Sequence, residues 1–146
     1  MSTGLRPPAW FWIVAVLLVL WEAMGVFSCI QQFRLGAEAM GPATNYDRAL
    51  YASLPVWYNY AYAVATFGGL LGGLALLLKE ARAVILFWIS LIAVLVMFGY
   101  LFATTDIIAH KGAGTVLPFP IVIALVGAFS IWFATMARAR RWIGGR

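Results

Sequence analysis

Residues 55–78 read PVWYNYAYAVATFGGLLGGLALLL, and a second apolar run, AVILFWISLIAVLVMFGYLFA, occupies residues 83–103. An α-helix needs about 20 apolar residues to cross the ~30 Å hydrocarbon core of a bilayer, so each run is long enough to span. Only residues 79–82, KEAR, join the two runs. A connection this short makes the two helices antiparallel neighbours.

Two further apolar runs flank this hairpin, at residues 9–30 and 116–137. Only helices and closed barrels satisfy the backbone in lipid, and none of the four runs shows the alternation of a barrel strand. The sequence therefore predicts an all-α integral membrane protein, a four-transmembrane-helix bundle. We expect residues 1–146 to form a single membrane domain.

The composition agrees with this class. Hydrophobic residues make up 64% of the chain and charged residues 10%, against about 45–50% and 25% in soluble domains. The mean hydropathy of +0.94 excludes disorder, and too little polar surface exists to cover a soluble globule. One cysteine, Cys29, excludes an intrachain disulfide and multi-cysteine metal sites.

The distribution of basic residues predicts the orientation. With four spans, both termini lie on one side, and that side carries seven of the ten basic residues: Arg6, Lys79, Arg82, Arg138, Arg140, Arg141 and Arg146. By the positive-inside rule, both termini are cytoplasmic. We interpret the tail at residues 138–142, RARRW, as an anchor to anionic lipid heads and not as a nucleic-acid site.

The first outer loop, residues 34–54, is long enough to hold structure. Asn45 is a candidate N-cap, and Tyr46, Leu50 and Leu54 follow at helical spacing. This pattern predicts a short amphipathic helix that lies on the outer membrane surface.

Glu22 is the one charged residue inside the apolar runs. It lies ~20 Å along the first helix, and thus ~10 Å below the outer surface. A carboxylate there costs free energy unless it is protonated, paired or in contact with water, and intramembrane acids are functional by default. The alternative is a structural role, in which a protonated Glu22 is hydrogen-bonded to fix helix packing.

Three polar side chains are predicted at a similar depth: Asn59 and Tyr62 on the second helix and Tyr100 on the third. Together with Glu22 they could form a ligand-binding pocket that opens outward. Two alternatives stay open. Tyr62 and Tyr100 also suit an interfacial aromatic belt, and Asn59 suits a hydrogen bond between helices.

Asp106 and His110 are four residues apart in the second outer loop, residues 104–115. They would share a face if the third helix continued past the membrane, and they are the only weak candidates for a metal site. Two ligands are too few, Glu38 would have to supply a third, and a solvated ion pair is the simpler interpretation. We therefore expect no metal and no other cofactor. Because no catalytic constellation is visible, we expect no enzyme.

Small residues follow one another at i, i+4 spacing on the second helix: Ala61, Ala65, Gly69 and Gly73, with Gly68 and Gly72 beside them. Small residues let helix backbones approach closely in lipid. The stripe predicts close helix packing, either within the bundle or with another subunit.

The segment WYNYAY at residues 57–62, the glycine stripe after it and the short basic turn resemble a group of small bacterial four-helix inner-membrane proteins. These proteins are often loosely labelled sugar transporters. The resemblance spans most of the chain and implies a location in the cell inner membrane, with no site residue carried over.

Two functions are compatible with these residues. The first is a small-molecule carrier or binding protein for a sugar-like or cationic ligand, with a polar pocket around Glu22 and working as a homo-oligomer. The second is a non-catalytic accessory or assembly subunit of a larger membrane complex, in which Glu22 is a structural hydrogen bonder. In both cases the lipid bilayer is a partner.

Overall fold

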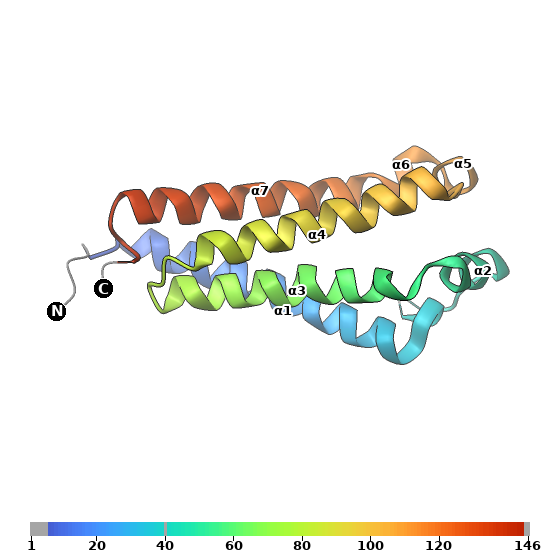
Figure 1. The fold of residues 1–146 in the computed structure, drawn as a ribbon, viewed down its shortest axis with the longest axis horizontal. Helices are drawn as coiled ribbons and strands as arrows, with labels where there is room; N and C mark the ends of the chain where they lie inside the picture. Colours follow the sequence, from blue (N-terminus) through green and yellow to red (C-terminus); the bar gives the residue numbers. More distant parts are fainter. Residues whose placement is uncertain (1–5, 40, 145–146) are drawn as a thin grey trace.

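Four long helices lie side by side in the computed structural model, which describes residues 6–39 and 41–144 (Figure 1). They are α1 (Ala9–Leu35), α3 (Val56–Leu77), α4 (Ala83–Thr104) and α7 (Pro118–Ala139). Each is long and apolar enough to cross a membrane. The prediction of an all-α four-helix membrane bundle is confirmed, and the chain is a multi-pass membrane protein.

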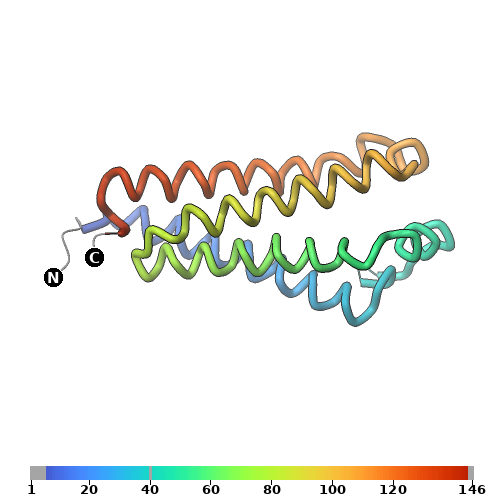
Figure 2. The backbone as a smooth tube through the Cα atoms, in the orientation of Figure 1, coloured from blue at the N-terminus to red at the C-terminus, as the bar shows by residue number. Residues whose placement is uncertain are grey.

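The four helices pack in a row that α1 and α7 close loosely, through ring contacts such as Phe11 with Phe133. α1 packs on α3, α3 on α4, and α4 on α7, so that α3 and α4 have a long neighbour on each side (Figure 2). α1 begins and α7 ends at one end of the bundle, which we call the terminal end. The opposite end, which we call the far end, carries the short helices.

The chain after α7 folds back under the terminal end. Arg141 adopts a left-handed conformation (φ 63°), and the backbone N–H of Trp142 donates to Ala137 O at 2.8 Å. The N–H of Gly144 then donates to Lys79 O in the α3–α4 turn at 2.7 Å. Trp142 and Ile143 are buried against the core, so this end of the tail is part of the bundle as well as a surface segment.

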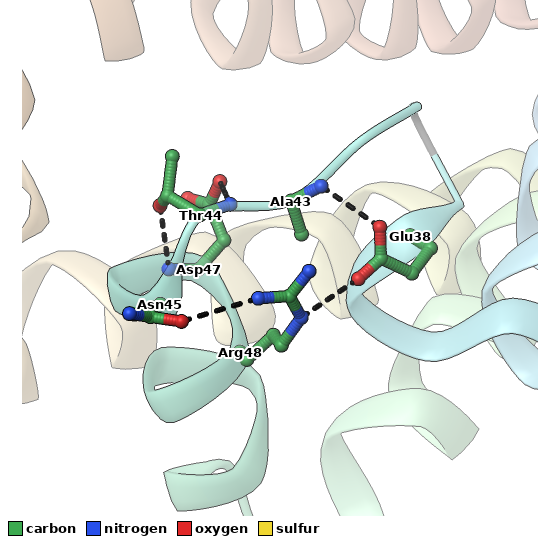
Figure 3. A network of polar contacts seen from close by, with 6 residues as sticks. All are labelled: Glu38, Ala43, Thr44, Asn45, Asp47 and Arg48. Atoms are coloured by element: carbon green, nitrogen blue, oxygen red, sulfur yellow. Dashed lines mark hydrogen bonds and ion pairs between the residues drawn. The ribbon is translucent and has the colours of Figure 1, made fainter.

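The first loop at the far end holds the predicted short helix, α2 (Asn45–Ser53), after a 3-10 turn, η1 (Gly36–Glu38). The prediction that Asn45 is its N-cap is wrong. Thr44 is the cap, because its Oγ1 accepts from the N–H of Asp47 (3.1 Å) while the Asp47 carboxylate accepts from the N–H of Thr44 (3.0 Å) (Figure 3). Reciprocal capping satisfies two free donors at once, which a cap at Asn45 would not do.

The second loop at the far end contains two short helices, α5 (Ile107–Lys111) and α6 (Ala113–Val116). α5 contacts α2 through Tyr46, whose hydroxyl donates to Asp106 Oδ1 (2.7 Å) and whose ring stacks on His110 (3.7 Å between centroids). Lys111 Nζ also lies 2.6 Å from Asp47 Oδ1. These contacts join the two loops across the far end.

Candidate functional site

The contact between α1 and α3 contains the residues that we predicted as functional. Glu22 lies against Gly69, Val19 against Gly73, and Gly25 against Thr66. From one contact to the next, the residue number rises by three on α1 and falls by three or four on α3, as expected for an antiparallel pair of helices. A Cβ atom at Gly69 would lie 2.8 Å from Glu22 Oε1 and closer still to Oε2 and Cδ. A larger residue at this position would require the carboxyl group, the flexible end of the Glu22 side chain, to move.

The same contact continues toward the far end through polar side chains. Tyr62 interacts with Ser28, and Thr66 with the Cys29 thiol. Beyond them, Gln32 Nε2 donates to Asn59 Oδ1 at 2.7 Å. We call this line the α1–α3 seam; it comprises Val19, Glu22, Gly25, Ser28, Cys29 and Gln32 of α1 and Asn59, Tyr62, Thr66, Gly69 and Gly73 of α3.

The seam ends at α2. Asn59 Nδ2 donates to the Tyr51 hydroxyl at 2.8 Å, and that hydroxyl lies 3.5 Å from Gln32 O. Three helices thus meet at Asn59, whose amide bonds to both α1 and α2. The sequence does not predict Gln32 and Tyr51 as site residues, because Gln32 lies between the first apolar run, which ends at residue 30, and the loop predicted from residue 34, and Tyr51 lies within that loop.

A cavity of ≈ 290 Å³ opens beside Asn59 at the far end. Its walls come from the end of α1, the last turn of α2 and the first turn of α3: Phe33, Tyr51, Ala52, Leu54, Pro55, Val56, Asn59 and Tyr60. None of these side chains carries a charge. The cavity therefore suits an uncharged group that combines an apolar surface with a hydrogen-bonding one.

Glu22 lies at the other end of the polar part of the seam, nearer the middle of the bundle than predicted. Gly69, its neighbour, is 13 residues from the start of α3, about 20 Å from the far end of that helix. The predicted depth of ~10 Å is counted to residue 30, whereas α1 continues to Leu35. Among the described residues, no side chain forms a hydrogen bond or an ion pair with its carboxyl group.

Tyr100, the fourth predicted site residue, lies in a different set of contacts. Its ring packs on Trp57 (4.9 Å between centroids) and Tyr58 (6.4 Å) at the contact of α3 with α4. The structure therefore brings Glu22, Tyr62 and Asn59 onto one seam, and it places Tyr100 in an aromatic cluster on a neighbouring face. Such a cluster is typical of the aromatic belt.

The small residues of α3 divide between its two neighbours. Gly69 and Gly73 face α1, whereas a Cβ atom at Gly72 would lie 2.8 Å from the Phe87 ring of α4, and one at Gly68 3.7 Å from Ser90. Ala65 and Ala61 belong to the apolar cluster formed with α4, and Ser90 Oγ donates to Ala65 O at 2.5 Å. The predicted stripe thus packs within the bundle, on two faces.

Asp106 and His110 do not lie on a continued third helix, because α4 ends at Thr104 and Asp106 immediately precedes α5. Both contact Tyr46 instead. Glu38 accepts hydrogen bonds from Ala43 N and Arg48 Nε (Figure 3). Within the described part of the chain, no group of three potential metal ligands comes together.

The loosely closed side of the row carries an apolar groove between α1 and α7. It has a volume of ≈ 440 Å³ and is lined by Val14, Leu17, Leu18, Trp21, Val122, Leu125, Val126 and Phe129. Ring contacts bound it on both sides, Phe11 with Phe133 (5.5 Å) toward the terminal end and Trp21 with Phe119 (6.5 Å) toward the far end. In a bilayer, such a groove is filled by lipid tails or by another helix.

No family profile, no curated protein and no solved structure matches this chain. The comparisons therefore assign no role to these residues.

Proposed function

We propose that this protein binds a small polar molecule within the membrane and carries it across, with Glu22 as the group that the ligand contacts. The observation that carries the proposal is the position of the Glu22 carboxyl: it packs on Gly69 inside the bundle and has no partner among the described residues. An unpartnered acid at this depth is a strong candidate for a functional group.

The polar line of the α1–α3 seam supports this function. Hydroxyl, thiol and amide groups would line the way from the cavity beside Asn59 to Glu22 once α1 and α3 move apart at their buried contact. Along this line a molecule can exchange hydrogen bonds to water for hydrogen bonds to protein, which lowers the cost of entering the bilayer. A carboxyl group at its end can accept hydrogen bonds from hydroxyl groups or bind a cation.

The most direct experiment is transport into proteoliposomes, with radiolabelled neutral polyols and organic monocations as probes. We expect uptake of at least one probe by the wild-type protein and its loss in Glu22→Gln, which keeps the shape of the side chain but cannot ionise. Glu38→Gln is the matched control, because it makes the same chemical change outside the seam. Equal uptake by wild type and Glu22→Gln would contradict the proposal.

Reaction with carbodiimides tests the state of Glu22 without a known ligand. Apolar dicyclohexylcarbodiimide reacts with protonated carboxyl groups in membranes, so we expect it to modify Glu22 in a pH-dependent manner. A bound ligand should slow this modification. A carboxyl group that is unreactive from pH 5 to pH 9 would instead favour a closed, purely structural contact with Gly69.

We further propose that the terminal end faces the cytoplasm of a bacterial cell and that the protein works as an oligomer. Seven of the ten basic residues belong to the side that carries the termini, and a row of four helices encloses little volume by itself. Cysteines placed at Ser53 and Arg82, in a Cys29→Ser background, should react with an impermeant thiol reagent from opposite sides of sealed membranes. Reaction of both from the same side would refute the orientation.

An accessory role in a larger complex is the second candidate, and the α1–α7 groove favours it. A helix of another subunit would fill the groove and leave Glu22 with a packing role only. In that case, the protein should migrate as part of a larger complex in native gels of membrane extracts. Substitution of Leu125 by Trp should dissociate that complex without changing the behaviour of the isolated protein.

A further inference from the structure

We infer that the terminal end of the bundle is a docking surface for the headgroups of anionic phospholipids. Four arginines form it: Arg6 before α1, Arg82 in the α3–α4 turn, and Arg138 and Arg140 at the end of α7. We call these residues the arginine face. The inference does not depend on the transport activity proposed above, nor on which side of the membrane this end faces.

The side chains of the arginine face are exposed and lack acidic partners. All four residues are exposed, and among the described residues no carboxylate forms an ion pair with any of them. Of the five acidic residues in the chain, only Glu80 belongs to this end. Within the described part of the chain, the positive charge of these four arginines is therefore not neutralised by a carboxylate.

Cations at the far end differ in this respect. Arg48 pairs with Glu38 at 2.9 Å and Lys111 with Asp47 at 2.6 Å, while Arg34 Nη1 donates to Gln31 Oε1. The far end thus pairs two of its three basic side chains with carboxylates, and only Arg34 has a neutral partner. Because four guanidinium groups without a carboxylate partner gather at the terminal end, against one at the far end, a partner that supplies negative charge fits the terminal end better.

The folded-back tail holds the arginine face in place. Trp142 packs on Trp10 (5.4 Å between centroids) and Phe11 (5.9 Å) of α1, and the Gly144 N–H bonds to the α3–α4 turn. The Arg140 guanidinium lies over the Trp142 ring at 5.4 Å. The ends of three chain segments are thereby fixed to one another, so the backbone positions that carry the arginines form a common surface.

The depth of this surface identifies the partner. α1, α3, α4 and α7 all begin or end here, so the arginines lie where the hydrocarbon ends and the lipid phosphates begin. A guanidinium group donates two parallel hydrogen bonds to a phosphate, and its aliphatic stem tolerates the apolar boundary. Near an anionic surface, each arginine is worth about a fivefold change in lipid affinity.

Lipid competition in detergent tests the inference. The purified protein is mixed with equal amounts of phosphatidylglycerol and phosphatidylcholine, and bound lipids are counted by native mass spectrometry. We expect phosphatidylglycerol to be retained over phosphatidylcholine by roughly tenfold or more. Arg82→Gln with Arg138→Gln and Arg140→Gln should abolish most of this preference, whereas Arg34→Gln, the matched far-end control, should preserve it.

Two results would overturn the inference. The first is a preference for phosphatidylglycerol that is equal in the wild type and the triple variant, or that Arg34→Gln lowers to the same extent. The second is full displacement of phosphatidylglycerol by millimolar inorganic phosphate, which would identify a site for the free anion. If the triple variant does not fold, Arg82→Gln alone still tests the surface, with an expected loss of about fivefold.

Discussion

The close contact of Glu22 with Gly69 makes a quantitative prediction for Gly69→Ala. The added methyl group would lie 2.8 Å from Glu22 Oε1 and closer to the rest of the carboxyl group, so α1 and α3 must separate or Glu22 must leave the seam. Overpacking of this kind costs about 1–3 kcal/mol, offset by up to about 1 kcal/mol from the higher helix propensity of alanine. We expect a net loss of about 0–3 kcal/mol.

Gly99 provides the matched control. It lies within α4, and nothing approaches the position of its missing Cβ atom within 4 Å. Gly99→Ala should therefore be neutral or stabilising, and the two variants should differ by about 1–3 kcal/mol in the free energy of unfolding. The measurement is reversible unfolding in mixed micelles of mild detergent and dodecyl sulfate.

A double-mutant cycle assigns the effect to the carboxyl group. Glu22→Ala removes the atoms that the new methyl group meets, so Glu22→Ala with Gly69→Ala should be more stable than the sum of the single effects by about 1–3 kcal/mol. If Gly69→Ala is as benign as Gly99→Ala, or if the double variant shows no coupling, Glu22 does not occupy the space that glycine leaves. The close contact of the half-buried Glu22 carboxyl with α3 would then be refuted.

Two further predictions concern the interhelical contacts. Ser90→Ala removes a hydrogen bond between α4 and Ala65 O of α3 and should destabilise the bundle by about 0.5–1.5 kcal/mol, whereas Ser130→Ala, which removes a bond within α7, should change the same unfolding measurement little. At the far end, Lys111→Asp should speed hydrogen exchange of the α2 amides, because it removes the ion pair and leaves the Thr44–Asp47 capping box in place. Unchanged exchange would show that this ion pair does not hold α2. The ammonium of Lys111 lowers the pKa of Asp47 to about 2, so the contribution of the pair is present above the ordinary pKa of 3.8 and is lost as the pH falls through 2.

The spans were predictable from sequence, because length and lack of charge suffice to define a helix in lipid. The start of α4 at Ala83 is as predicted, and the start of α3 at Val56 differs by one residue. The end of α1 was not predictable in this way. Its last turn contains Gln31, Gln32 and Arg34, which read as loop residues when apolarity is the criterion, although a helix that leaves the bilayer needs no apolar side chains.

The partners of the candidate site were less predictable than the spans. A column of small residues shows that another helix packs closely, but it does not show which helix this is. In the structure, Gly69 packs on α1 and Gly72 on α4. Tyr62 and Tyr100 are of the same type and similar predicted depth, and both pack against the apolar cluster between α3 and α4. Only Tyr62 also contacts α1, whereas the Tyr100 ring packs on Trp57 of α3. Depth follows from counting residues, whereas the direction of a side chain around the helix depends on packing between helices.

The α1–α3 seam also bears on how the chain enters the membrane during synthesis. α1 leaves the ribosome first, and the residues that will face Glu22 and Gln32 follow only with α3. At 5–20 residues per second, the roughly 40 residues between the ends of these helices take about 2–8 s to translate. For that interval, an acid and an amide lie in a helix whose partner does not yet exist. Insertion of this protein therefore requires a host for α1, either the translocon or an associated chaperone, that accommodates a carboxyl group until the glycines of α3 arrive.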